Sequence, residues 1–254
     1  MSLAISNLAW EISEDLKVFE ELKKLGINQI EGVLTKLGSW SKINDDVIHN
    51  FKSHLTENEL EIKSIQSIFY GVDISTLDDT KKVINHIENL LRYSKILDLN
   101  LMVLGSPSLR VLNDYSYGQL KKTLTEIDNV LMGSDVEISI EPNARIYGGQ
   151  YFFRLGEIIE FLNQCKFTNI KTMIDTHNLI MEGDDPCILF REYSKHINHI
   201  HISEPNLSAL FNFELHNKFS EVLRDMSYDK TITLEMKNNG NIIESVKNFS
   251  LIYK

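Results

Sequence analysis

The sequence predicts an α/β fold, a single (β/α)8 barrel that occupies residues 1–254 as one domain. Strand-like apolar runs alternate with amphipathic helical segments from one end of the chain to the other, which is typical of a parallel sheet. The length of 254 residues is close to the roughly 250 of a closed barrel of this kind. No Pro-, Gly- or Ser-rich linker divides the chain, so we expect one domain.

Eight short segments have the apolar composition of buried strands. The predicted strands are Leu3–Ser6, Gln29–Val33, Ile62–Ile68, Leu101–Gly105, Val136–Glu141, Ile170–Asp175, Ile197–Ser203 and Thr231–Met236. The chain continues from the first strand as Asn-Leu-Ala-Trp, without a glycine. An open doubly wound sheet usually has a glycine-rich phosphate turn at this point, so the sequence favours the closed barrel.

The segments between these strands have apolar residues spaced three or four apart, which indicates helices with one face on the sheet. In the first helix Leu16, Phe19, Leu22 and Leu25 share a face, and Gly26 ends it. The predicted helices are Glu14–Leu25, Asp45–Leu55, Asp78–Leu97, Gln119–Leu131, Phe152–Cys165, Pro186–Lys195, His216–Met226 and Ile242–Ile252.

Two of these helices carry further signals. Asn44 precedes the second helix as an N-cap residue, because its side chain can accept a hydrogen bond from the first turn. The long third helix places Val83, Ile87, Leu90 and Leu91 on its inward face.

Composition and charge narrow the function classes. The net charge is −10, from 36 acidic and 26 basic residues, and no cluster of Lys and Arg offers a track for a nucleic-acid backbone. No apolar run approaches the ~18 residues of a membrane span, and the first ten residues do not resemble a signal peptide. Cys165 and Cys187 are expected to be reduced packing residues. We therefore expect a cytoplasmic protein that binds neither nucleic acid nor a membrane.

Four of the predicted strands end in residues that can bind a metal ion. These are Glu141, Asp175, His201 and Glu235, and successive positions differ by 34, 26 and 34 residues. Such spacing is about one strand–helix unit, which takes roughly 30 residues or more. Because consecutive parallel strands of a barrel end at the same mouth, where active sites of this fold lie, we expect the four side chains to meet.

The four residues form a mixed nitrogen and oxygen ligand set. Such a set suits one divalent ion, Mn²⁺, Co²⁺, Mg²⁺ or Zn²⁺, and no thiolate favours zinc. At an open mouth the ion keeps positions for substrate oxygens and can act as a Lewis acid on a carbonyl. Glu141 and Glu235 could also exchange a proton with the substrate, which makes them candidate catalytic residues.

Other polar residues near the predicted strand ends are weaker candidates. His199 shares the inward face with His201, two residues deeper, and either orients a ligand or fills the barrel. His177 is expected on the loop after the sixth strand, where it could contact a substrate. Glu204 is either a substrate contact or a helix cap, and Glu31 is a weaker site candidate at the end of the second strand. Four histidines on helical stretches are expected to face solvent: His49, His54, His86 and His196.

These residues lie in motifs that resemble a known family. The motifs are Ile140-Glu141-Pro142-Asn143 with Tyr147-Gly148, Ile174-Asp175-Thr176-His177, His199-Ile200-His201-Ile202-Ser203-Glu204-Pro205, Leu234-Glu235-Met236-Lys237 and Ser6-Asn7-Leu8-Ala9-Trp10. They resemble the sugar phosphate isomerase/epimerase family, within the xylose isomerase-like TIM barrels, and cover nearly the whole chain. The resemblance implies that Glu141, Asp175, His201 and Glu235 bind the metal and that Glu141 and Glu235 are the acid/base pair. The substrate-binding candidates are then His177, His199, Glu204, Asn143, Lys237, Asn7 and Trp10.

The implied activity is isomerisation or epimerisation of a sugar, or sugar phosphate, by proton transfer through an enediolate. The small-molecule sugar itself is not specified, and a homo-oligomer is compatible with the sequence. Two departures from the family pattern concern the substrate more than the metal. Asn178 stands where many relatives have a histidine, and Pro205–His216 contains no arginine.

Three alternative functions use parts of the same pattern. A lyase or dehydratase acting on a polyol ketone would need the same metal and base. A non-catalytic sugar-binding barrel would not need an inward Glu235. A nuclease for abasic DNA is disfavoured, because its metal cluster needs further histidines and the segments Gln66–Tyr70 and Leu104–Arg110 contain none.

Overall fold

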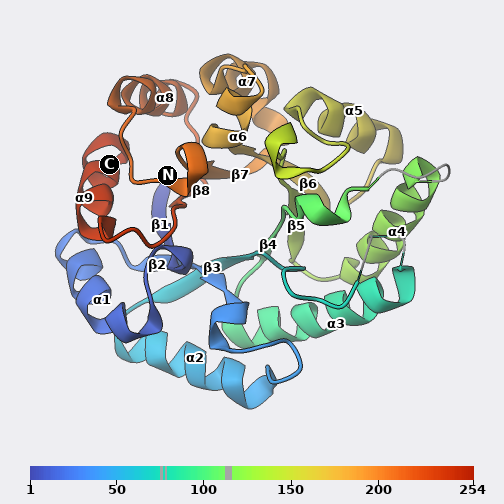
Figure 1. Ribbon diagram of the computed structural model, residues 1–254, viewed down its shortest axis with the longest axis horizontal. Helices are drawn as coiled ribbons and strands as arrows, with labels where there is room; N and C mark the ends of the chain where they lie inside the picture. The colour runs from blue at the N-terminus through green and yellow to red at the C-terminus, as the bar shows by residue number, and fades with distance from the viewer. Residues whose placement is uncertain (75–76, 78, 112–115) are drawn as a thin grey trace.

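The computed structural model describes residues 1–254 except 75, 76, 78 and 112–115. Its strands form a closed parallel barrel in sequence order, β1 to β8, as the sequence predicts (Figure 1). The strands are β1 Ser2–Ser6, β2 Gln29–Val33, β3 Glu61–Gln66, β4 Leu101–Leu104, β5 Glu137–Ile140, β6 Ile170–Asp175, β7 Ile197–Ile202 and β8 Thr231–Leu234. Pairing of β1 with β8 closes the barrel, with Ser2 opposite Thr231.

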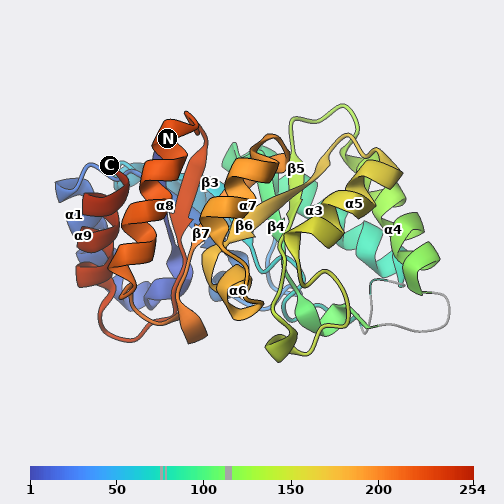
Figure 2. The same ribbon diagram turned by 90° about the horizontal axis from the view of Figure 1, so that it is seen from above.

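Helices surround the barrel, and an edge-on view places them along its outer wall (Figure 2). They are α1 Asp15–Lys24, α2 Asp45–Glu57, α3 Thr80–Leu97, α4 Ser116–Leu131, α5 Leu155–Cys165, α6 Thr176–Met181, α7 Pro186–Tyr193, α8 Phe213–Asp225 and α9 Ile242–Tyr253. Across the described ranges, no helix combines the length and the apolar character that a membrane span requires.

The two faces of the strands differ in polarity as expected. In β5, Ile138 and Ile140 are buried in the apolar core between the strands and the helices. The polar side chains of Ser139, His199 and Thr233 are also fully buried. Ser139 donates a hydrogen bond to the side chain of Asn198 at 2.7 Å, and Thr233 lies 3.4 Å from His199, so these groups meet inside the barrel.

Several predicted strands extend one or more residues beyond the hydrogen-bonded ladder. Glu141 and Glu235 therefore directly follow β5 and β8 rather than ending them. The backbone N–H of Glu141 still donates to Leu104 O at 3.1 Å, and that of Glu235 to Ile202 O at 2.9 Å. These two contacts with the neighbouring strands keep both side chains at the mouth.

The segment after β6 is a helix, which corrects the prediction of a loop at His177. Helix α6 begins at Thr176 because Asp175 acts as its N-cap, accepting the Asn178 N–H at 2.6 Å. A helix of six residues is too short to produce a clear periodic signal, so the pattern before Pro186 did not reveal it.

Two burial predictions on other helices are wrong. Leu16 was placed on the inward face of the first helix but is 68% exposed, because α1 begins at Asp15 and turns Phe19 and Leu22 toward the core. His86 was expected to face solvent, but it is buried in α3 and its Nε2 lies 2.6 Å from Ile68 O. The predicted start of that helix, Asp78, lies outside the described residues.

Candidate metal centre

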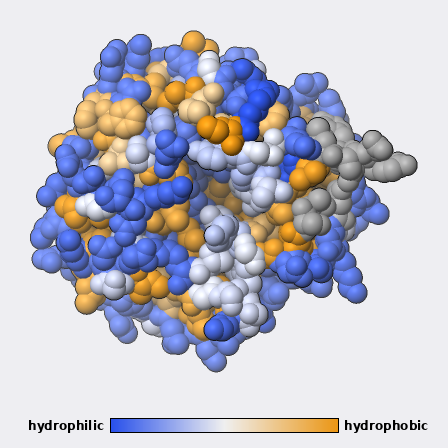
Figure 3. All heavy atoms as spheres, viewed as in Figure 1, coloured by the Kyte–Doolittle hydropathy of each residue, from blue (hydrophilic) through white to orange (hydrophobic). Residues whose placement is uncertain are grey.

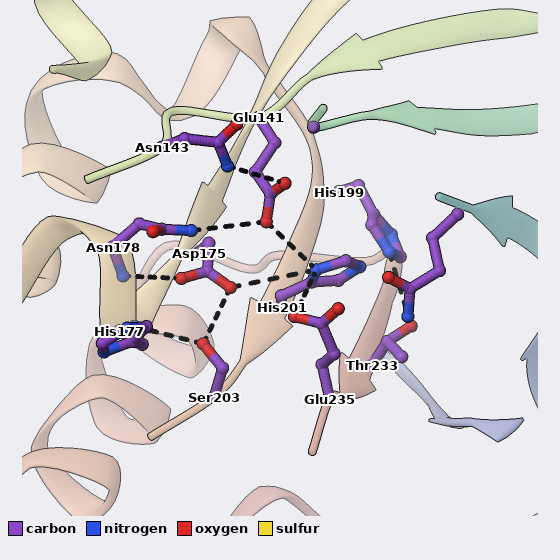
Figure 4. Close-up of polar contacts among 12 residues, drawn as sticks. Glu141, Asn143, Asp175, His177, Asn178, His199, His201, Ser203, Thr233 and Glu235 are labelled. Atoms are coloured by element: carbon purple, nitrogen blue, oxygen red, sulfur yellow. Dashed lines mark hydrogen bonds and ion pairs between the residues drawn. The ribbon is translucent and has the colours of Figure 1, made fainter. Parts of the chain in front are cut away.

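Four side chains converge where β5 to β8 end. Glu141 follows β5, Asp175 is the last residue of β6, His201 lies in β7 and Glu235 follows β8. One ligand atom from each residue lies within 4.8 Å of those of the other three. Figure 4 shows the side chains pointing toward one another, and Figure 3 shows a hollow at the centre of this face. The structure thus brings the four predicted ligands together.

The imidazole of His201 faces the three carboxylates. Its Nδ1 is 3.3 Å from Glu235 Oε2, 3.7 Å from Glu141 Oε1 and 3.9 Å from Asp175 Oδ2. Nδ1 is buried and has no well-directed hydrogen bond to any described residue. A buried nitrogen of this kind needs an explanation. A cation bound by Nδ1 and the carboxylate oxygens would supply one, so the donor set fits a divalent ion.

Burial and mutual repulsion favour protonation of this cluster. Burial raises the pKa of Asp175 well above its ordinary value, and the charges of Glu141 and Glu235 raise it further. Burial also raises the pKa of Glu235. Burial alone would lower the pKa of His201, but the carboxylates of Glu31 and Glu235 raise it well above its usual value. A divalent cation would compete with these protons and relieve the repulsion between the carboxylates.

Two asparagine amides orient the Glu141 carboxylate. Asn143 Nδ2 donates to Oε2 at 3.0 Å, and Asn178 Nδ2 donates to Oε1 at 3.4 Å. The Asn178 side-chain oxygen also accepts the backbone N–H of Ala144 at 3.0 Å, which joins α6 to the segment after β5. Asn143 was predicted to contact substrate, and the structure places its amide on Glu141. Asn178, noted in the sequence only as a departure from the family, is a supporting residue of the site.

Asp175 is held by two further donors. The Asn178 N–H donates to Oδ1 at 2.6 Å, and the Ser203 hydroxyl donates to Oδ2 at 2.7 Å. The same carboxylate therefore starts α6 and faces the cluster. Such supporting hydrogen bonds fix the direction of a metal ligand.

The end of β4, the strand next to β5, leaves room for the Glu141 side chain. Gly105 follows β4, and a methyl group on its Cα would overlap Glu141 Oε2. The buried guanidinium of Arg110 donates to the carbonyl oxygens of Leu104, Gly105 and Glu141 and so ties the ends of the two strands together. Burial lowers the pKa of Arg110 to about 10, so this residue stays positively charged at neutral pH.

Gly105→Ala is expected to weaken divalent-metal binding about tenfold or more, a typical cost of disturbing the support of a ligand. The added methyl group takes the space of the Glu141 carboxylate, which must turn away from the cluster. Metal affinity is measured by competition with a chelator. Gly118→Ala in α4 is the matched control, since no atom lies within 4 Å of the added group. Equal metal affinity in the wild type and Gly105→Ala would show that metal binding does not require the space that the missing side chain of Gly105 leaves for Glu141.

His177 lies in α6 and is buried, and its Nε2 is 2.5 Å from the hydroxyl of Tyr147. Tyr147 ends the short helical turn Arg145–Tyr147 after β5 and is 41% exposed. Burial raises the pKa of Tyr147, and the nearby charge of Asp175 adds to the effect, so its hydroxyl stays protonated. Tyr147 is therefore a candidate hydrogen-bonding residue at the mouth that sequence reasoning did not select.

Glu204 makes hydrogen bonds within the segment that connects β7 to α8. Its Oε1 accepts the backbone N–H groups of Phe211 at 3.0 Å and Asn212 at 2.6 Å and lies 3.1 Å from His216 Nε2. Burial alone would raise the pKa of Glu204, but the hydrogen bond with His216 helps to lower it. The two accepted N–H groups directly precede α8, which is compatible with the predicted helix cap, and a substrate contact stays a prediction.

Three residues predicted to bind substrate have no contact with the four-residue cluster among those described below. Asn7 accepts the backbone N–H of Val33 at 2.7 Å, and Trp10 donates its indole N–H to Asp15 at 2.7 Å. Asn7 and Trp10 line a cavity of about 420 Å³ whose wall includes residues of α1 and α2. Lys237 is exposed, three residues after β8. Their roles in substrate binding stay predictions.

His199 lies beside His201 within the barrel and contacts Glu31. Its Nε2 is 2.9 Å from Glu31 Oε2, and both side chains are fully buried. Burial lowers the pKa of His199, which favours the neutral ring. Both roles considered for His199, orienting a ligand and filling the barrel, stay predictions.

Comparison with known proteins agrees with this architecture. Residues 19–250 match the protein family described as xylose isomerase-like TIM barrel. No curated protein matches the chain.

Solved structures with the same fold include sugar epimerases. The apo 3-keto-D-glucoside 4-epimerase of E. coli has 16% identity and a TM-score of 0.76, with 99% of this chain and 97% of that chain covered. D-psicose 3-epimerase of Clostridium cellulolyticum, solved with D-tagatose, has 18% identity, a TM-score of 0.75 and coverage of 100% and 96%. A probable 3-DHS dehydratase of Bacillus anthracis has 16% identity, a TM-score of 0.68 and coverage of 99% and 98%. At these identities the likeness establishes the fold.

Proposed function

The chain belongs to the xylose isomerase-like TIM-barrel family, and we propose that it is a divalent-metal-dependent isomerase or epimerase of a small sugar or sugar phosphate. The observation that carries this proposal is the cluster of three carboxylates and one imidazole at the barrel mouth. Glu141, Asp175, His201 and Glu235 would hold the ion. A bound divalent ion would supply Lewis acidity toward the carbonyl of the substrate.

Exposure divides the four ligands into two pairs. The side chains of Asp175 and His201 are 1% and 0% exposed, whereas those of Glu141 and Glu235 are 12% and 9% exposed. A substrate entering the mouth can therefore reach the two glutamates, while the other two ligands stay behind them. This difference supports Glu141 and Glu235 as the acid/base pair.

In the proposed reaction one glutamate carboxylate removes the proton from the carbon beside the substrate carbonyl. The electron pair of the C–H bond then moves toward the carbonyl oxygen and gives an enediolate. The other glutamate, in its acid form, returns a proton to the opposite face of the same carbon, which inverts that centre. Protonation of the former carbonyl carbon, with transfer of the hydroxyl proton between the two oxygens, gives aldose–ketose isomerisation instead. The raised pKa of Glu235 supports proton exchange closer to neutral pH.

Deuterium exchange on a panel of ketoses and ketose phosphates tests the proposal. The protein is stripped with a chelator, reloaded with Mn²⁺, Co²⁺, Mg²⁺ or Zn²⁺, and incubated with each sugar in D₂O. We expect about one ion per chain, and metal-dependent incorporation of deuterium beside the carbonyl of at least one sugar. Proton NMR detects both the exchange and the appearance of an epimer or aldose.

The outcomes separate the alternatives. Exchange followed by loss of water from the neighbouring carbon would identify a lyase, because elimination begins with the same proton removal. Saturable sugar binding without exchange would identify a non-catalytic sugar-binding barrel. Absence of metal binding with all four ions would contradict the proposal at its first step.

A further inference from the structure

The second ring nitrogen of His201 faces a carboxylate from another part of the barrel. Glu31, in β2, is fully buried, and its Oε1 lies 2.8 Å from His201 Nε2. Its Oε2 lies 2.9 Å from His199 Nε2 and accepts the hydroxyl of Ser64 at 2.5 Å. One carboxylate of β2 thus spans two buried imidazoles that both lie in β7.

We propose that Glu31 is the positioning residue of the metal centre: its carboxylate holds the Nε2 side of His201 and so directs Nδ1 toward Glu141, Asp175 and Glu235. The inference rests on the metal site of the proposed function and concerns a residue that would not itself bind the ion. It adds an internal partner to the four residues at the mouth.

The chemistry of imidazole gives the reason. A neutral histidine carries its proton on one nitrogen and a lone pair on the other, and only the lone pair binds a metal ion. A carboxylate near Nε2 stabilises the proton there, which leaves the lone pair on Nδ1. A ring held in this way also donates more electron density to the metal than an unsupported one.

Buried hydrogen bonds hold the Glu31 carboxylate in place. Its Oε2 accepts the hydroxyl of Ser64 at 2.5 Å. His199, whose Nε2 lies 2.9 Å from the same oxygen of Glu31, also restrains that carboxylate.

Glu31, His199 and His201 could also be read as ligands of a second ion, because their ligand atoms lie within 4.8 Å of one another. The hydrogen bond between His199 Nε2 and Glu31 Oε2, at 2.9 Å, gives that imidazole a partner without an ion. The contact of Glu31 Oε1 with His201 Nε2, at 2.8 Å, is a close ion pair whose direction is not that of a hydrogen bond. The number of ions per chain decides between the two readings.

Glu31→Gln tests the proposal with little change in volume. The variant loses the negative charge and presents an amide to one of the two imidazoles. We expect the dissociation constant for Zn²⁺ or Co²⁺, measured by chelator competition, to rise about 10- to 100-fold. Glu137→Gln is the matched control, because Glu137 is also a glutamate of a barrel strand and contacts Asn198 at 2.9 Å. Circular dichroism and thermal melting of the metal-free proteins verify that both variants fold.

A second measurement needs no variant of Glu31. In the Zn²⁺-loaded wild-type protein, nitrogen-15 NMR of the histidine rings should show His201 with its proton on Nε2 and the metal on Nδ1. The reverse arrangement would overturn the proposal even if Glu31→Gln failed to fold.

The outcomes distinguish this inference from the proposed function. A wild-type protein that binds no ion contradicts both. A wild-type protein that binds one ion, with equal affinity in Glu31→Gln, contradicts only the positioning role. Two ions per chain, one of them lost in Glu31→Gln, would make Glu31 a metal ligand and would also overturn the inference.

Discussion

Replacing Glu235 by glutamine is expected to lower kcat about 10²- to 10⁴-fold, the usual contribution of a general acid or base. Glutamine keeps the size of the side chain but cannot remove or return a proton near neutral pH. The residue follows β8, its Oε2 lies 3.3 Å from His201 Nδ1, and burial raises its pKa. Turnover is measured by NMR with the sugar that shows the fastest deuterium exchange.

Glu235 is also a candidate metal ligand, so the assay must separate the two roles. The variant is compared with the wild type at saturating metal, after the metal affinity of each protein has been determined. Glu137→Gln again serves as a control, because it removes a glutamate charge at the start of β5. Near-wild-type kcat in metal-saturated Glu235→Gln would remove Glu235 from the acid/base pair.

The positions of the four candidate ligands were predictable because a closed parallel barrel is governed by simple periodicities. Three of the strands concerned, β5, β7 and β8, alternate apolar and polar residues, so their apolar and polar faces could be separated in the sequence. The repeat of about 30 residues then placed Glu141, Asp175, His201 and Glu235 at one mouth. Local pattern and topology agree here, which is why the convergence of these four side chains could be anticipated.

Contacts between side chains of strands on different sides of the barrel produce no periodic signal in the sequence. Glu31 meets His199 across 168 positions of the sequence, and no periodicity reports which strands face each other at that depth. Gly105 appeared only as the end of a strand, although its missing side chain makes room for Glu141. In the sequence, Asn178 only replaces a histidine that many relatives have. The structure shows that its side-chain amide donates a hydrogen bond to the Glu141 carboxylate.

Short helices and peripheral residues were uncertain for a different reason. Helix α6 depends on one capping contact from Asp175, and that residue had been assigned to metal binding alone. Trp10 was selected through the family motif, yet its indole N–H reaches Asp15 in α1. In both cases a residue type compatible with a functional role also satisfies a local structural need, and only the geometry separates the two.

The affinity for a divalent ion is expected to rise with pH, by about tenfold per pH unit for each proton that the metal displaces. The metal-free protein has raised pKa values at His201 and Asp175, so the folded state holds protons there that the unfolded chain releases. The stability from protonated His201 is complete below its ordinary pKa of about 6.5 and is lost as pH rises through the folded-state pKa. The melting temperature of the metal-free protein should therefore fall above pH 6.5, while stabilisation by added metal should grow.

Other buried histidines act in the opposite direction. Burial lowers the pKa of His86, His177 and His199, so the folded protein gains stability from them as pH rises through the ordinary histidine pKa of about 6.5, and this gain ends once the unfolded chain is neutral there. Chelator competition at pH 6.5, 7.5 and 8.5 measures the affinity, and melting with and without metal measures the stabilisation. The metal-loaded protein should lose less stability over this range, because the ion takes the place of the protons. A metal affinity that stays constant from pH 6.5 to 8.5 would show that binding displaces no proton and would contradict the assignment of His201 as a ligand.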